Sequence, residues 1–186
     1  MASLFFPLAM RVMGASTSAA GALQMPRTII TIFLPTIAGV WVGKKASNAW
    51  KAMVVGTLFV AVPMAVMGFT TPSTSIIIYF VALTITGIAE SYRSVAITPS
   101  AQATLQPADM GVGTSLVNFV NSLANTIAAT VFGVAYNLST SADPTNVAYI
   151  QNGVNSVFRL AAIVAVIGLV LVIFVVRPKM TAKKAE

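Results

Sequence analysis

The sequence lacks cysteine and histidine, and acidic residues are scarce. Glu90, Asp109, Asp143 and Glu186 are the four acids among 186 residues. Without thiolate or imidazole ligands, and with so few carboxylates, the chain has no residue set typical of a metal site and can form no disulfide. It also contains no H-E-x-x-H or G-x-S-x-G pattern and no closely spaced pair of acids. We therefore expect neither an enzyme nor a metal or cofactor site.

Charge of either sign is scarce as well. Charged residues make up 8% of the chain and hydrophobic residues 57%, with a mean hydropathy of +0.88. An ordinary soluble domain carries about 25% charged residues, which help to cover its surface with polar groups. Eleven basic and four acidic residues cannot do so for a chain of this size. The composition predicts an integral membrane protein and excludes a soluble enzyme, a coiled coil and a disordered tail.

Long hydrophobic runs, by contrast, are plentiful. A transmembrane helix needs about 20 mostly apolar residues. Five runs meet this requirement, and they cover residues 23–42, 52–69, 76–97, 112–136 and 157–176. Polar or turn-rich segments separate them, at residues 43–51, 70–75, 98–111 and 137–156. The predicted fold class is an all-α, polytopic membrane helical bundle in which residues 1–186 form a single membrane domain.

The N-terminal segment is shorter than the other apolar runs. Residues 2–15 are interrupted by Arg11, and at 1.5 Å per residue they reach only about 20 Å of a hydrocarbon core about 30 Å thick. We interpret this segment as a partial helix whose beginning is missing. A signal peptide is the alternative, although the basic residues that would precede its apolar region are absent.

The basic residues lie mainly beside the apolar runs. If the spans alternate in direction, Arg27 and Arg159 fall on one side of the membrane, and the flanking residues fall on the other. The positive-inside rule assigns the more basic side to the cytoplasm. We predict a multi-pass protein of the plasma membrane with a basic cytoplasmic tail at residues 177–186. The net charge of +7 then faces lipid headgroups, and we expect no nucleic-acid partner. Seven residues flank the runs on the basic side: Lys44, Lys45, Lys51, Arg177, Lys179, Lys183 and Lys184.

The span at residues 76–97 carries two charged residues, Glu90 and Arg93. Because they are three apart, they share a face of a helix and can pair. Glu90 is about 21 Å along this helix from Ile76, in the inner third of the membrane. Charges inside a membrane are costly and mark packing or transport sites. Two interpretations stay open: a structural ion pair near the interface, or a carboxylate that exchanges a proton or meets a cationic substrate in a water-filled cavity.

The span at residues 112–136 carries three asparagines, Asn118, Asn121 and Asn125, on a stripe of small and polar residues. Small residues let membrane helices approach closely, and asparagine side chains form hydrogen bonds across the gap. A packing seam and the lining of a cavity both agree with this pattern.

Three segments resemble the major facilitator superfamily. Residues 39–45 resemble its loop motif, G-x-x-x-D-[RK]-x-G-[RK]-[RK], in the degenerate form of C-terminal halves. Residues 106–127 resemble the penultimate helix of multidrug facilitators, where a P-x-x-x-G turn precedes an N-F-x-x-x-L-G core. Residues 12–26 resemble the outer turn between the first two helices of that half. In the loop motif, Gly39 matches the first glycine and Lys44 the basic position, Gly43 replaces the acid, and Lys45 follows.

The resemblance covers nearly the whole chain in family order. It implies the C-terminal half of a major facilitator fold, similar to the fourteen-helix drug:proton antiporters. Such proteins are built from two halves around a midplane site, so the implied partners are the lipid bilayer, an N-terminal half, a small-molecule substrate and protons. The chain alone would be an inactive fragment. Alternatives are half of a sugar or metabolite facilitator, or a non-transporting membrane subunit or remnant. The candidate residues of the substrate or proton pathway are Glu90, Arg93, Asn118, Asn121 and Asn125.

Overall fold

The computed structural model describes residues 5–12, 14, 16–102, 105–143 and 145–182. These residues form helices and connecting turns, and no strand occurs among them. Five helical segments are long and apolar enough to cross a membrane. The predicted all-α bundle with five spans is therefore confirmed. The segments are Ser18–Lys44, Ser47–Met67, Ile76–Gln102, Pro107–Thr140 and Val147–Met180.

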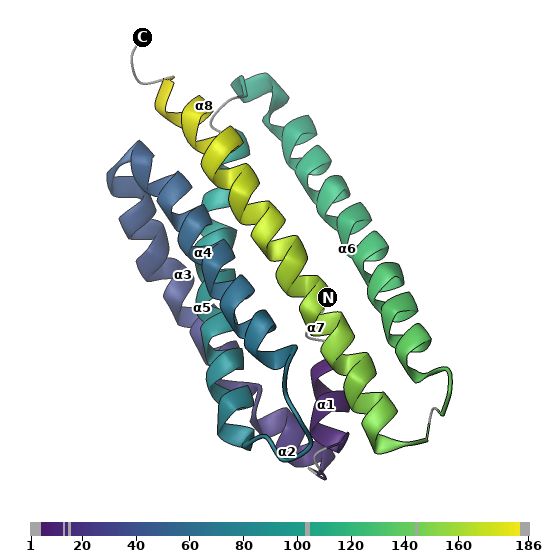
Figure 1. Cartoon of the computed structure of the whole chain (residues 1–186). Coiled ribbons are helices and arrows are strands. Elements are labelled where there is room, and N and C mark those ends of the chain that lie inside the picture. The colour runs from purple at the N-terminus through teal and green to yellow at the C-terminus, as the bar shows by residue number, and fades with distance from the viewer. Residues whose placement is uncertain (1–4, 13, 15, 103–104, 144, 183–186) are drawn as a thin grey trace.

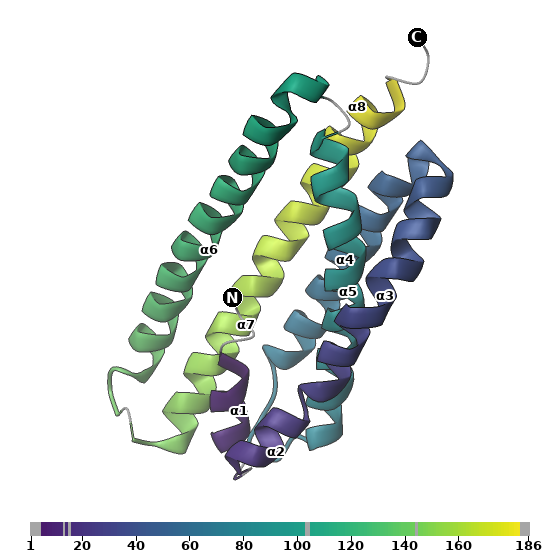
Figure 2. The same ribbon diagram turned by 180° about the vertical axis from the view of Figure 1, so that it is seen from behind.

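The long helices run up and down along roughly one direction (Figure 1). α3 (Met25–Lys44), α4 (Ala46–Met67) and α5 (Ile76–Gln102) pack together, and α7 (Val147–Leu171) packs against α4. α6 (Met110–Thr140) lies at the edge of the bundle beside α7 (Figure 2). The bundle is thus a packed group of four helices with a fifth at its side.

Basic residues gather at one end of the bundle, which we call the basic end. The α3–α4 turn, the end of α5, the start of α6 and the C-terminal helix lie there (Figure 1). α7 reaches it through a π-helical turn, η3 (Val172–Val176), and continues as α8 (Arg177–Ala182). The Arg177 guanidinium lies 5.0 Å from the centre of the Trp50 ring. Aromatic and basic side chains in contact are typical of a membrane–water interface. Lys183 and Lys184, counted with this end from the sequence, lie outside the described residues.

The largest hydrophobic core lies toward the opposite end of the bundle. There the short helix α1 (Phe6–Val12) packs against α7. The Phe6 ring meets the Tyr79 ring of α5 at 5.7 Å between centroids, and the Phe5 ring meets the Tyr136 ring of α6 at 5.6 Å. α1 therefore fills the space between α5, α6 and α7 at this end. It lies within the predicted partial helix 2–15, of which residues 2–4, 13 and 15 lie outside the described residues.

A second short helix, α2 (Thr17–Ala22), joins α1 to α3. Ser16 caps it, because its Oγ accepts a hydrogen bond from Ala19 N at 3.2 Å. Pro26 lies in the first turn of α3, where a missing backbone N–H costs no helical hydrogen bond. The run predicted at residues 23–42 is thus α3, with α2 as a separate turn of helix ahead of it.

The helices extend further into the predicted connections than expected. The connection at 43–51 shrinks to Lys45, where the backbone is extended, because α4 starts at Ala46. α5 continues to Gln102, so its connection to α6 is shorter than the predicted 98–111. The predicted connection at 137–156 is also wrong, since α6 ends at Thr140 and α7 begins at Val147. Polar residues in these segments bond within or between helices, and polarity alone therefore did not mark the helix ends.

Two glycines let the helices of the packed group approach closely. A Cβ atom at Gly56 of α4 would lie 2.5 Å from Arg93 Cγ and 2.9 Å from the Ala89 carbonyl oxygen of α5. A Cβ atom at Gly87 of α5 would lie 3.0 Å from the Arg27 carbonyl oxygen of α3. Small residues at such crossings let helix backbones pack in a membrane. These contacts fix the positions of Arg27 of α3 and Gly56 of α4 along α5.

Candidate functional site

An ion pair joins the start of one long apolar helix, α3, to the middle of another, α5. Arg27 Nη2 in the first turn of α3 donates to Glu90 Oε2 in α5 at 2.6 Å. α5 has 27 residues, so it is about 40 Å long, and Glu90 lies about 21 Å from its start. Because α5 extends to Gln102, Glu90 is near the middle of the helix, and its place in the inner third of the membrane stays a prediction.

Arg27, which was predicted to lie on the outer side of the membrane, is beside the middle of α5. Its backbone lies against Gly87, three residues before Glu90 in α5. The start of α3 is therefore beside the middle of α5, with α2 and the preceding turn between it and the opposite end. Arg27 is thus a charge within the span Ser18–Lys44, which makes it a candidate for function by the same reasoning as Glu90.

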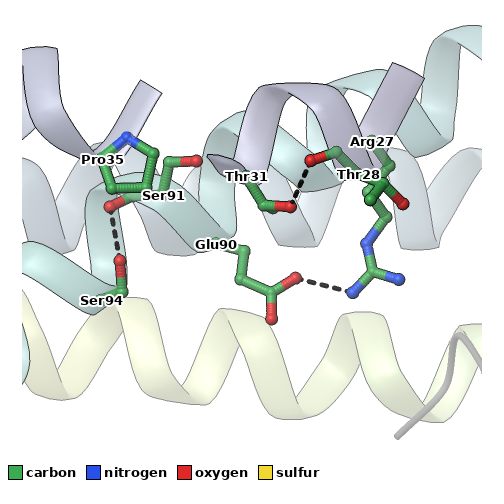
Figure 3. A pocket seen from close by; sticks show the side chains of 7 residues that line it. All are labelled: Arg27, Thr28, Thr31, Pro35, Glu90, Ser91 and Ser94. Carbon is green, nitrogen blue, oxygen red and sulfur yellow. Dashed lines mark hydrogen bonds and ion pairs between the residues drawn. The ribbon is translucent and has the colours of Figure 1, made fainter. Parts of the chain in front are cut away.

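Arg93 is not the partner of Glu90, so the predicted pair within α5 is corrected. Residues three apart on an α-helix point in directions about 60° apart. Arg93 lies on the side of α5 that meets Gly56 of α4. The Glu90 carboxylate instead points toward the Arg27 guanidinium (Figure 3). Glu90 therefore belongs to the contact between α5 and α3, and Arg93 belongs to the contact between α5 and α4.

The ion pair lines an open pocket of about 350 Å³. Hydroxyl groups from α3 and α5 surround the charges and donate mainly to their own helices: Thr31 Oγ1 to the Thr28 carbonyl at 2.9 Å, and Ser94 Oγ to the Ser91 carbonyl at 2.9 Å. Ser91 Oγ also lies 3.5 Å from the Ile30 carbonyl of α3. The hydroxyl oxygens keep free lone pairs. The pocket thus offers a cation, an anion and neutral acceptors to a ligand. Its lining residues, drawn in Figure 3, are Arg27, Thr28, Thr31, Pro35, Glu90, Ser91 and Ser94.

The charges of the pocket are only partly bonded. The Glu90 side chain is 56% exposed and that of Arg27 26% exposed. A guanidinium carries five N–H donors, yet Arg27 Nε is buried without a partner among the described residues. The unused donors of Arg27 and the exposed oxygens of Glu90 can therefore still bind a further ligand, water or a proton.

The three asparagines of α6 do not join this pocket. Asn118, Asn121 and Asn125 are exposed, and their side chains form no hydrogen bond to another described residue. They lie on the same face of α6 as Thr114, which accepts from Gln102 Nε2 of α5 at 2.8 Å. The structure therefore brings Glu90 together with Arg27, and it leaves the asparagines on an unoccupied face of α6.

The predicted loop motif is mostly helical. Gly39, Gly43 and Lys44 belong to α3, and Lys45 alone has an extended backbone. Asn48 Nδ2 donates to the Trp41 carbonyl at 2.7 Å, and the Trp41 ring meets the Tyr92 ring of α5 at 6.0 Å. These contacts hold the α3–α4 turn tightly against α5 at the basic end.

Sequence reasoning missed a buried polar cluster near the opposite end, formed by Thr70, Tyr79, Gln151 and Asn155. Tyr79 OH donates to Thr70 Oγ1 at 2.6 Å, and Asn155 Nδ2 donates to the Thr70 carbonyl at 2.7 Å. Gln151 Nε2 donates to Asn155 Oδ1 at 2.9 Å. The spacing of Gln151 and Asn155, four apart beside Val154 and Val157, could have indicated a buried helical face.

Sequence reasoning also missed Arg27 and the hydroxyl residues of the pocket. Arg27, Thr28 and Thr31 lie within one turn of an apolar helix, and this grouping was the available signal.

No group of acids among the described residues could hold a metal ion. Comparison of the chain with protein-family models, with curated proteins and with solved structures finds no match.

Proposed function

We propose that this chain forms one half of a proton-coupled secondary transporter of the multidrug-efflux type, with the Arg27–Glu90 pocket in its substrate or proton pathway. The observation that carries the proposal is the half-exposed ion pair between the first turn of α3 and the middle of α5, both within apolar segments long enough to cross a membrane. Charges within such segments are costly unless they serve a purpose or are fully paired. A structural pair would be expected to be buried and bonded at every position.

The geometry supports an exchange mechanism. Glu90 holds Arg27 through a single contact at 2.6 Å. Protonation of the carboxylate would remove its charge and release the guanidinium, and a cationic substrate would compete with Arg27 for the same oxygen atoms. Proton and substrate then exclude each other at Glu90, which is the coupling that an antiporter requires.

The pocket is open to the surface of the bundle, so this chain supplies only one wall of it. A facing wall from an N-terminal half would complete a midplane site, as in transporters built from paired repeats. The proposal therefore includes a partner half and a small-molecule substrate, and it makes the chain inactive alone. The basic end is cytoplasmic in this proposal, and the membrane is the plasma membrane, with the C-terminus inside.

A second candidate is half of a sugar or metabolite facilitator. The hydroxyls of Thr28, Thr31, Ser91 and Ser94 in the pocket favour it, because hydroxyl and amide groups bind sugars by neutral hydrogen bonds. In that case Glu90 would orient a hydroxyl group of the substrate, and transport would not depend on the proton gradient.

The test measures the rate at which cells of the native host expel a cationic dye. The cells carry either the normal chromosomal gene or the Glu90→Gln variant. We expect the energised efflux rate to fall by at least about tenfold, because the amide cannot take up a proton. Asp109→Asn, an exposed acid outside the pocket, is the matched control and should keep the normal rate. Unchanged efflux in the Glu90 variant would contradict the pathway.

Three further results separate the alternatives. Dye efflux that persists after an uncoupler dissipates the proton gradient would favour the facilitator. Uncoupler-sensitive efflux in a foreign host that produces only this chain would contradict the proposal that it is half of a transporter. If deletion of the gene removes no transport activity from the host, a non-transporting subunit or remnant is favoured.

A further inference from the structure

We infer that the Arg27–Glu90 pocket binds protonated amines through their N–H groups, and that Pro35 contributes to this selectivity by freeing a backbone carbonyl. The inference rests on the proposed function in treating the pocket as the substrate site, and it adds the substrate class. Primary and secondary alkylammonium ions belong to this class. Quaternary ammonium ions carry the same charge without an N–H group, and the pocket discriminates against them.

The four hydroxyl groups of the pocket can accept hydrogen bonds, because their own protons are already engaged. Thr28 and Thr31 donate to carbonyls three or four residues back, at 3.2 and 2.9 Å. Ser91 and Ser94 do the same in α5, each at 2.9 Å. A hydroxyl oxygen has two lone pairs besides its one proton. Each of these side chains therefore offers a ligand an acceptor.

The charges of the pocket add further acceptors and one donor group. The Glu90 carboxylate has two oxygens and no proton. Arg27 contacts Oε2 at 2.6 Å, and none of the described residues donates to Oε1. Among the seven residues that line the pocket, only the Arg27 guanidinium keeps donors for a ligand. Because Arg27 is itself bonded to Glu90, the rest of the lining consists of acceptors.

Pro35 adds a backbone acceptor to this set. It lies inside α3, and because proline has no amide hydrogen, the carbonyl four residues earlier lacks its usual helical donor. That carbonyl belongs to Thr31. Carbonyls of an α-helix point along the axis toward the residue four positions on, and Thr31 and Pro35 both line the pocket. The Thr31 carbonyl therefore lies at the wall of the pocket without its helical hydrogen bond.

The acceptors come from two helices that face each other. Figure 3 shows Thr31 of α3 next to Glu90 of α5, with Arg27 on one side and Pro35, beside Ser91, on the other. A ligand held by both Glu90 and the Thr31 carbonyl would bridge α3 and α5. The Pro35 ring supplies an apolar surface beside these oxygens, which suits the alkyl part of an amine.

A ligand of this pocket must bring donors together with positive charge. A primary ammonium group has three N–H donors and no acceptor. It can bond to the Glu90 carboxylate, in competition with Arg27, and still reach the Thr31 carbonyl and a hydroxyl oxygen. Hydrogen bonds from charged donors are about twice as strong as those from neutral ones. A quaternary ammonium ion is attracted to Glu90 but leaves the other oxygens desolvated and unbonded, which is costly.

The test measures how well two ligands protect a single cysteine in the pocket, since the chain has none of its own. The reporter is Ser94→Cys, because Ser94 lines the pocket. The purified chain is labelled in phosphatidylcholine mixed micelles with a negatively charged methanethiosulfonate reagent, which reacts with thiols and not with amines. The ligands are butylammonium and butyltrimethylammonium, which share their charge and alkyl chain. Asp109→Cys, at an exposed position outside the pocket, is the control.

We expect butylammonium to halve the labelling rate at position 94 at a concentration at least about tenfold lower than butyltrimethylammonium requires, because hydrogen bonds between charged and neutral groups are strong enough for this ratio. Neither ligand should change the labelling at position 109. If Ser94→Cys fails to fold, Thr28→Cys, at another exposed residue of the pocket, takes its place.

The role of Pro35 is tested in the same assay. Pro35→Ala restores an N–H donor to the Thr31 carbonyl and should reduce the ratio between the two ligands by about threefold, through weaker binding of butylammonium alone. Pro99→Ala, at an exposed proline inside α5 and outside the pocket, is the matched control and should keep the ratio. Pro35→Leu restores the same N–H group and repeats the test if the alanine variant fails to fold.

Three outcomes would overturn the inference. They are equal protection by the two ligands, no protection by either, and an unchanged ratio in the Pro35 variants. Because the assay measures binding and not transport, the proposed function fails separately. Dye efflux lost in Glu90→Gln, together with equal protection by the two ligands, would keep the pathway and reject the substrate class. A preference for butylammonium, together with efflux unaffected by Glu90→Gln, would keep the amine site and reject the pathway.

Discussion

Two groups of polar side chains lie among the apolar helices, and they differ in burial and in how extensively they bond to one another. In the buried polar cluster, Thr70, Gln151 and Asn155 are at most 7% exposed, and their hydrogen bonds join the α4–α5 connection to α7, although Gln151 Oε1 has no partner among the described residues. In the Arg27–Glu90 pocket, one ion pair is half exposed, and the surrounding hydroxyls bond mainly to their own helices, with one longer contact of 3.5 Å from Ser91 Oγ to the Ile30 carbonyl of α3.

The difference separates a structural role from a functional one. Buried polar groups that satisfy one another hold helices in a unique arrangement. Exposed polar groups that keep unused donors and acceptors can bind something else. The cluster therefore fixes the α4–α5 connection onto α7, whereas the pocket has the properties of a binding site. The two groups should differ most clearly in how much they contribute to the stability of the fold.

The largest loss of stability is expected from Asn155→Leu in the buried cluster. Leucine removes the hydrogen bonds from Asn155 Nδ2 to the Thr70 carbonyl at 2.7 Å and from Gln151 Nε2 to Asn155 Oδ1 at 2.9 Å, and two typical hydrogen bonds together contribute about 1–3 kcal/mol. Reversible unfolding in mixed micelles measures the change. Asn152→Leu, three residues away and exposed, is the control and should change stability little. Equal effects in the two variants would show that the cluster does not stabilise the fold.

A smaller loss is expected from Tyr79→Phe. The variant removes the hydrogen bond from Tyr79 OH to Thr70 Oγ1 and keeps the ring contact with Phe6. A typical hydrogen bond contributes about 0.5–1.5 kcal/mol, and unfolding in the same micelles should report a loss in this range. Tyr149→Phe, on an exposed tyrosine at the start of α7, serves as the control. No loss at Tyr79 would contradict the role assigned to its hydroxyl.

Glu90→Gln should have a still smaller effect on stability, although we expect it to abolish transport. Ion pairs that remain exposed to solvent contribute about 0–1 kcal/mol. The comparison is with Asp109→Asn under identical conditions. A loss of about 3–5 kcal/mol, typical of breaking a buried pair, would place Glu90 with the structural residues.

The smallest effect is expected from Asn121→Leu on α6. This side chain is exposed and bonds to no other described residue, so the change should lie within about 0.5 kcal/mol, as for most surface substitutions. Asn155→Leu provides the contrast, as the same substitution at a buried and hydrogen-bonded asparagine. A loss at Asn121 comparable to that at Asn155 would mean that this face of α6 is already packed.

The sequence predicted the five spans, because long apolar runs need no partner to be recognised. It also predicted Glu90 as a polar residue within a span. It did not predict the Arg27–Glu90 pair, which joins residues 63 positions apart through a close backbone contact at Gly87. Gln151 and Asn155 were assigned to a connection because they are polar, whereas they bond to Thr70, which is 81 and 85 positions away. Both the ion pair and the buried cluster form through contacts between helices, and the hydropathy of the sequence does not reveal such contacts.

The most direct test of the open pocket is the water accessibility of Ser94, which lines it. Ser94→Cys is labelled in vesicles with a charged maleimide that does not cross the bilayer. The control is Leu58→Cys, which is 41% exposed on α4 at a similar depth, two residues from Gly56 where α4 crosses α5. The account predicts rapid labelling at position 94 and little at position 58. Equally slow labelling at both would mean that the Arg27–Glu90 pair is dry and structural, and would contradict the account.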